Sequence, residues 1–242
     1  MTGTKSPLDA VQLPICGNIP KTLSERLPMR SRLAYCAITA LILPSAVLAE
    51  NLSFSGGVNV TSNYLSDGLS ETGNQPAIQP YFELVKNGFF AGVWATNLKD
   101  DAGNRAELDL SFGYRGKTGT GLDYEVGYKQ YFYDQTRAAS SELALSLGMP
   151  VTDRLSVSGE VSYDLVEKTF GESLGAEFVL ADDWTLHADV GRVDPSASVN
   201  WGAGIGYALD NRTTLDLQVQ ATTSTSPLVA LSVNYAFGDA SE

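Results

Sequence analysis

The residues whose types and spacing come nearest to catalytic machinery are His187 and Asp189. His187 is the only histidine of the chain, and residues two apart in an extended strand project from the same face. An Asp–His pair on one face is what a general base requires. However, no serine nucleophile can be placed beside it, and the spacings of metal sites and phosphate-binding loops are missing. We interpret the pair as part of a hydrogen-bond network and expect no enzyme, no metal and no cofactor.

His187 and Asp189 belong to a larger set of polar side chains that alternate with apolar ones, and we predict that this set lines the inside of one sheet. The candidate lining residues are Glu107, Asp109, Arg115, Glu125, Lys129, Glu142, Glu160, Asp164, Glu177, His187, Asp189 and Asp216, with Glu83, Asp123 and Arg154 placed on the same face. Acids outnumber bases in this set, so a passage lined by it would favour cationic or neutral solutes. The alternative is that the charges form ion pairs between neighbouring strands and fill the space.

The elements that carry these side chains are recognised by their period of two. Between Glu107 and Tyr133, apolar residues alternate with charged or small ones on both sides of a tight turn at residues 117–121. Such regular alternation marks strands whose two faces meet different surroundings. The pattern recurs along the chain and predicts twelve strands, at residues 52–61, 77–85, 89–96, 107–115, 122–133, 142–149, 154–164, 173–180, 184–193, 199–208, 213–222 and 228–237.

The connections between these strands also alternate, between tight turns and longer polar loops. Asn87-Gly88 is the strongest hairpin signal, whereas segments such as residues 98–105 are long. An even number of strands, with short turns at one end and long loops at the other, is typical of an outer-membrane barrel. We therefore predict an all-β, transmembrane, antiparallel up-and-down β-barrel of about 12 strands, located in the cell outer membrane.

Aromatic residues gather near the predicted strand ends, as expected of belts at the two headgroup levels. One belt is Phe89, Tyr114, Tyr124, Trp184, Tyr207, Tyr235 and Phe237; the other is Trp94, Phe132, Tyr133, Tyr163 and Trp201. The last strand alternates up to Phe237 and resembles the C-terminal signal through which the barrel-assembly machinery recognises its clients. The expected partners are this machinery, outer-membrane lipid and lipopolysaccharide, and small solutes. A net charge of −12 argues against nucleic acid.

The N-terminal part has the composition of a targeting segment. Residues 1–28 lack periodicity and are predicted to be a mis-called or unstructured extension, and residues 29–49 form a signal peptide with a basic start, an apolar centre and a small-residue end. Cleavage after Ala49 would leave residues 50–242 as the barrel. Both cysteines, Cys16 and Cys36, would be removed with the leader.

Two segments carry a resemblance to a known family. Residues 62–79 and 87–97, which include Ser62-Asn63-Tyr64 and Asn87-Gly88-Phe89-Phe90, resemble the opening of the TorF-like porins, a bacterial family of otherwise unknown function. The resemblance implies an outer-membrane channel and specifies no substrate. The family tends to carry basic residues after the tyrosine, where this chain has Leu65-Ser66-Asp67. If those residues help to bind an anion, this chain would have lost that property.

The width of the interior decides between two functional hypotheses. Twelve strands imply a narrow lumen, and the glycines at 113, 127, 148, 175, 202, 204 and 206 fall on the inward register. Because glycine leaves room there, we expect a slender pore that conducts small solutes. The alternatives are a non-conducting barrel that acts as a structural or surface-interaction protein, and a soluble periplasmic or secreted β-protein.

Overall fold

The computed structural model describes residues 52–136, 140–193 and 198–238. The regular elements in these residues are strands: β1 (Leu52–Thr61), β2 (Leu65–Ser66), β3 (Leu69–Ser70), β4 (Ala77–Lys86), β5 (Phe89–Asn97), β6 (Ala106–Lys117), β7 (Asp123–Tyr133), β8 (Ser141–Pro150), β9 (Leu155–Asp164), β10 (Phe170–Ala181), β11 (Trp184–Val193), β12 (Asn200–Ala208), β13 (Thr213–Thr222) and β14 (Leu228–Gly238). The predicted extension (1–28) and signal peptide (29–49) lie outside the described residues, so both stay predictions.

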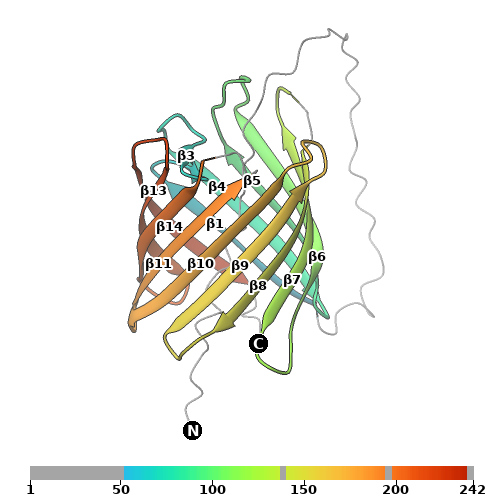
Figure 1. The fold of residues 1–242 in the computed structure, drawn as a ribbon, viewed down its shortest axis with the longest axis vertical. Helices are drawn as coiled ribbons and strands as arrows, with labels where there is room; N and C mark the ends of the chain where they lie inside the picture. The colour runs from blue at the N-terminus through green and yellow to red at the C-terminus, as the bar shows by residue number, and fades with distance from the viewer. Residues whose placement is uncertain (1–51, 137–139, 194–197, 239–242) are drawn as a thin grey trace.

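Twelve strands, β1 and β4 to β14, close into one antiparallel barrel (Figure 1). Each strand pairs with its neighbours along the chain, and β1 also pairs with β14, in a register that sets Val58 opposite Tyr235. The short connections lie at one end of the barrel, called here the turn end, and the long ones at the other, called the loop end. The predicted twelve-stranded up-and-down barrel is confirmed.

Two local features differ from the prediction. The first long loop, residues 62–76, contains the small hairpin β2–β3, whose central residues Asp67 and Gly68 both have positive φ. Arg154 was placed in a strand on the inner face, and this was wrong. The Thr152 hydroxyl accepts hydrogen bonds from the backbone N–H groups of Arg154 and Leu155, so the turn extends through Arg154 and its side chain is exposed.

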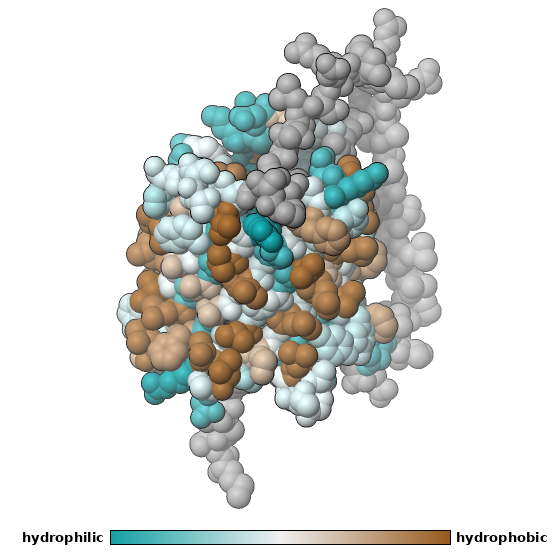
Figure 2. Space-filling view, viewed as in Figure 1, coloured by the Kyte–Doolittle hydropathy of each residue, from teal (hydrophilic) through white to brown (hydrophobic). Residues whose placement is uncertain are grey.

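The apolar side chains of the alternation point out of the barrel. Leu174 is 67% exposed and Phe89 is 65% exposed, and Figure 2 shows hydrophobic residues spread over the outside of the wall. A water-soluble sheet would bury such residues, whereas a membrane barrel presents them to lipid. One small buried apolar cluster lies inside the barrel, where Tyr64, Ala77 and Trp94 pack with Tyr81. In the described part of the chain, the structure has no helix that is long and apolar enough to cross a membrane.

The aromatic belts are largely as predicted. Outward-facing rings pair between neighbouring strands, with centroids 4.9 Å apart for Phe89 and Tyr114 and 4.5 Å apart for Trp184 and Tyr207. Two belt assignments are wrong, because both residues occupy the inward register of their strands. Trp94 is 9% exposed and packs inside the barrel against Tyr64, and Tyr133 lies opposite the inward-facing Glu107.

The outward apolar surface gives a test of the membrane-spanning arrangement. Leu145 lies midway along β8 and Val151 lies in the following turn, and both side chains are about half exposed. Replacing Leu145 with Arg should lower the free energy of unfolding by about 2–4 kcal/mol, because a charge would face hydrocarbon. The matched Val151→Arg change should alter it by less than about 0.5 kcal/mol. Urea unfolding in lipid vesicles measures the free energy of unfolding of both variants. If both changes have equally small effects, the membrane-spanning arrangement is contradicted.

Candidate functional site

The inside of the barrel gathers the charged residues that the sequence singled out. All twelve candidate lining residues occupy the inward register of their strands, opposite to the exposed apolar side chains. They fall into two groups on different parts of the wall. The first group lies on β6 to β9, next to Glu83 of β4, and contains both acids and bases; the second lies on β10 to β13.

The first group is organised around Arg115 of β6. Its guanidinium donates two hydrogen bonds to the Glu83 carboxylate, at 2.9 and 2.6 Å, and its Nε lies 3.0 Å from Glu125 Oε2. The bonds to Glu83 on β4 reach across β5, where the guanidinium carbon lies 4.4 Å from the centre of the Phe90 ring. Two carboxylates, one cation and one ring thus form a fixed unit on the inner wall. Here the alternative of internal ion pairs holds.

The same wall also carries Lys129 and two more glutamates, Glu142 and Glu160. Lys129 Nζ lies 5.6 Å from the centre of the Tyr131 ring. The Ser146 hydroxyl donates to Glu160 at 2.6 Å, and the Tyr131 hydroxyl lies 3.5 Å from Glu142. Glu107 and Asp109 are buried nearby on β6. Carboxylates therefore outnumber cations in this region.

The second group contains His187, Glu177, Asp189 and Asp216. His187 Nε2 lies 2.8 Å from Asp216 Oδ2, and this contact passes over Gly204 of the intervening strand β12. Glu177 lies directly opposite His187 in the ladder between β10 and β11. The inward positions of β10 to β13, as far as these strands are described, carry no Lys or Arg. This half of the wall is therefore acidic.

The inward glycines make room for neighbouring side chains and not only for a solute. The Phe90 ring occupies the space above Gly113 and Gly127, Asp189 occupies that above Gly202, and His187 that above Gly204. A methyl group at Gly204 would collide with the His187 ring. The expectation that these glycines leave room holds only in part: neighbouring side chains take the space at five of them, whereas Gly148 and Gly206 meet nothing closer than 3.8 Å.

A cavity remains inside the barrel, beside strands β4 to β9. Its volume is about 150 Å³, which equals roughly five water molecules at the density of the liquid. Gly92, Ser111 and Ala144 form its floor, and larger side chains that include Trp94, Arg115 and Glu142 surround it.

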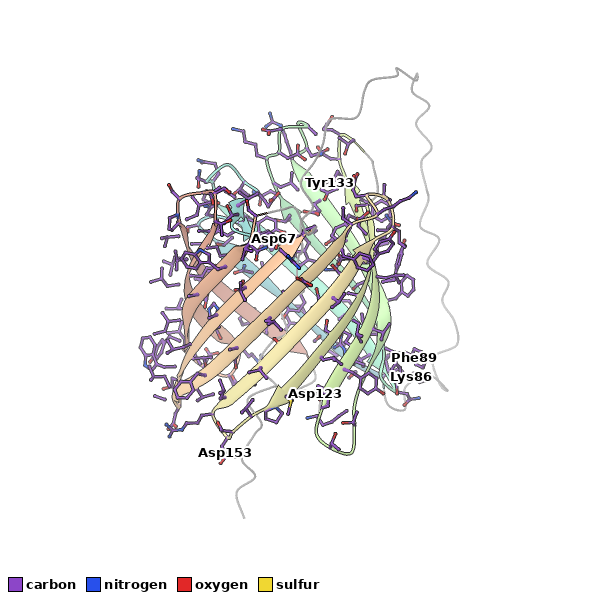
Figure 3. The ribbon with its side chains drawn as sticks, in the orientation of Figure 1. Asp67, Lys86, Phe89, Asp123, Tyr133 and Asp153 are labelled. Carbon is purple, nitrogen blue, oxygen red and sulfur yellow. The ribbon has the colours of Figure 1, made fainter. Side chains whose placement is uncertain are left out.

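The first long loop, residues 62–76, folds into the mouth of the barrel. Its residues Tyr64 and Leu65 are buried, and at its tip the Asn200 amide donates to Asp67 at 3.0 Å while Gly68 N–H donates to Gln220 at 3.2 Å. Figure 3 shows Asp67 toward the loop end of the barrel. The loop thus reaches from Trp94 on β5 to the inner side of β12 and β13.

Gly68 is required for this contact. It has φ +76, and its Cα lies so close to the backbone of Ala221 that a Cβ would collide with it. Inside the loop, the side-chain oxygen Oδ1 of Asn63 accepts hydrogen bonds from the hydroxyl groups of Ser70 and Thr72. The loop is therefore a folded partition across part of the opening.

The other loops at this end brace one another. Lys99 N–H donates to the Glu71 carbonyl at 2.7 Å, and the buried Asn104 accepts from the N–H groups of Gln135 and Thr136. Hydrogen bonds from the backbone N–H groups of Arg105 and Ala106 lower the pKa of Asp134. A lowered pKa stabilises the fold above the ordinary pKa of aspartate, and this contribution is lost as the pH falls through the lowered value.

Sequence reasoning missed several of the residues that shape this interior. Phe90, Trp94 and Tyr131 occupy inward positions. The alternation of the strands could have shown this, because Phe90 and Trp94 are two residues from the inward Gly92, and Tyr131 is two residues from the inward Lys129. The role of residues 62–76 could not be read from alternation, because a turn-rich loop has no faces. Among residues 52–136, 140–193 and 198–238, no group of three or more His, Cys, Asp or Glu is arranged to hold a metal ion.

The class of fold is a closed twelve-stranded barrel with an apolar outside and a charged inside, and the two KdgM porin structures have a similar fold. The KdgM porin superposes with a TM-score of 0.60 at 14% identity, covering 76% of this chain and 99% of that one. The KdgM porin in complex with disordered oligogalacturonate gives a TM-score of 0.58 at 13% identity, covering 76% and 99%. The NanC porin gives 0.47 at 11% identity, covering 76% and 97%.

The family follows from the sequence itself. The family model described as "Bacterial protein of unknown function (Gcw_chp)" matches residues 46–240, so the chain belongs to this family. No curated protein matches the chain.

The ion-pair unit around Arg115 generates a prediction on stability. Replacing Arg115 with Met should lower the free energy of unfolding by about 1–3 kcal/mol, since two neighbouring carboxylates would lose their shared donor. Adding Glu83→Gln and Glu125→Gln to that variant should restore part of the loss, because the repulsion disappears with the charges. The coupling between the cation and the two carboxylates is measured by urea unfolding of four proteins. These are the unchanged chain, Arg115→Met, Glu83→Gln with Glu125→Gln, and the triple variant. Additive effects would show that the three side chains do not act as a unit.

Proposed function

We propose that the chain forms an outer-membrane porin-like channel for passive diffusion of small solutes, with a narrow acidic lumen that favours cationic or neutral ones. The observation that carries this proposal is a closed barrel whose outside is apolar and whose inside is lined by charge. The cavity beside β4 to β9 supports it, because part of the interior is not filled by side chains.

The preference for cations is argued from the unequal wall. On β10 to β13 the acids Glu177, Asp189 and Asp216 face the lumen beside a single histidine. Fixed charge of one sign concentrates the opposite ion in a narrow passage. On the other wall Arg115 is engaged by two carboxylates and Lys129 lies opposite Glu142, so these bases offset little of this field.

Location and assembly belong to the same proposal. The resemblance to the TorF-like porins and the porin-type fold are consistent with the outer membrane, reached by way of the signal peptide at residues 29–49. Outer-membrane lipid and lipopolysaccharide would cover the outward apolar surface. The barrel-assembly machinery would recognise β14, whose outward residues end at Phe237.

The second candidate function is a non-conducting barrel that serves as a structural or surface-interaction protein. One observation favours it: residues 62–76 lie across part of the mouth, and they are held on both sides by buried contacts. A barrel sealed in this way would present its braced loops as a rigid outer surface.

Ion conduction separates these two functions. In planar lipid bilayers the full mature chain should give single channels whose reversal potential in a KCl gradient indicates preference for K⁺. The variant with Glu177→Gln and Asp189→Asn should shift the permeability ratio toward one, because two lumen charges are removed. The matched control, Asp153→Asn with Asp182→Asn, removes two exposed turn acids and should leave the ratio unchanged. A folded barrel without conductance would favour the non-conducting alternative.

The partition at the mouth gives a separate prediction. Replacing Asn200 and Gln220 with Ala removes the two side chains that hold the tip of the loop. Single-channel conductance should rise, since residues 62–76 would no longer be fixed across the opening. Asn234→Ala is the control, because it removes an inward-facing amide nearer the turn end. Unchanged conductance in the double variant would mean that the loop does not limit the current.

A further inference from the structure

The cavity inside the barrel, beside β4 to β9, has two chemically different sides. Aromatic rings of Tyr81, Phe90 and Trp94 form one side, and carboxylates of Glu125, Glu142 and Glu160 form much of the other. Small residues, Gly92, Ser111 and Ala144, also line the cavity, and the Arg115 guanidinium covers one face of the Phe90 ring. A site of this kind offers π faces and negative charge together.

The charge of this lining is not balanced from within. Four glutamates and two bases line the cavity, the fourth glutamate being Glu83. Arg115 already bonds to Glu83 and Glu125, so its charge is used within the wall. Lys129 lies opposite Glu142 in the ladder between β7 and β8, so its charge is also used within the wall. Glu160 receives a hydroxyl contact from Ser146, and a hydroxyl group carries no net charge. Four acids against two bases leave an excess of two acids in this lining, which a bound cation would offset.

We propose that this cavity is a binding site for small organic ammonium ions. The ammonium group would lie against Glu142 and Glu160, and its apolar body would lie against the Trp94 ring. The volume of about 150 Å³ admits a molecule of about six non-hydrogen atoms. This inference rests on the proposed channel function, because it names the class of solute that the lumen would take.

The position of the site relative to the loop supports the assignment. Trp94 lines the cavity on one side and packs against Tyr64 on the other, with ring centroids 5.7 Å apart. Tyr64 belongs to the loop that lies across the mouth, so the site lies directly behind that partition. A cation that passes the loop would meet these rings and carboxylates next.

Tryptophan fluorescence provides a direct binding assay. The chain contains three tryptophans, of which Trp184 and Trp201 face outward and Trp94 lines the cavity. In the full mature chain with Trp184→Phe and Trp201→Phe, folded in detergent, Trp94 is the sole reporter. Butane-1,4-diamine should change its emission saturably at constant ionic strength. Butane-1,4-diol and butanedioate, which have the same length but no positive charge, should not.

Variants identify the groups that bind the cation. Glu142→Gln with Glu160→Gln in the single-tryptophan background should weaken binding of the diamine at least tenfold. Glu177→Gln with Asp189→Asn, which removes two acids from the opposite wall, should change it less than twofold. Heat-modifiable gel mobility checks that each variant is folded, and a misfolded pair is replaced by Glu142→Gln alone.

The outcomes separate this inference from the channel proposal. The site is overturned if the diamine gives no saturable change, if the diol or the dianion acts equally well, or if both wall variants weaken binding alike. Absence of conductance in bilayers, with diamine binding intact, would overturn the channel proposal and leave the binding site in place. Conductance without diamine binding would overturn the binding site and leave the channel proposal in place.

Discussion

The structure depends on the requirement that every backbone N–H and C=O group in a lipid environment finds a partner within the protein. An open sheet would leave two edges unpaired, and hydrocarbon cannot replace the missing bonds. Pairing between β1 and β14 removes both edges. Closure also separates two environments, so the period-two alternation of each strand becomes an apolar outside and a polar inside. The exposed leucines, valines and rings follow from this one constraint.

The closed wall then determines how the interior can be organised. Inward side chains of adjacent strands are crowded, and some polar contacts reach over one strand to the next. Arg115 reaches Glu83 across β5, and His187 reaches Asp216 across β12. The first contact passes beside the Phe90 ring, whereas the second needs a small residue beneath it, because a Cβ at Gly204 would collide with His187. Some glycines of the inner face therefore make room for polar side chains such as Asp189 and His187, and others for the Phe90 ring.

The sequence predicted those features that depend on alternation. The twelve strands, the closure and the inward position of residues such as Glu107 and His187 follow from parity, because each residue in a strand faces opposite to its neighbours. Trp94 and Tyr133 were misplaced because residue type was weighed above parity: a ring near a strand end was assigned to a lipid belt. Arg154 was misplaced because the turn continues one residue further, through hydrogen bonds to a hydroxyl that no periodicity reveals.

Tertiary contacts explain what the sequence could not predict. Residues 62–76 are rich in turn formers, and turn chemistry indicates the Asp67-Gly68 hairpin but not where it docks. Its position results from long-range contacts, with Tyr64 against Trp94 on one side and Asp67 with Asn200 on the other. Because the same Trp94 ring also borders the cavity, the loop and the lumen share one side chain. The entrance and the interior of the barrel are therefore physically connected, and a change in the packing of Tyr64 reaches the lining directly.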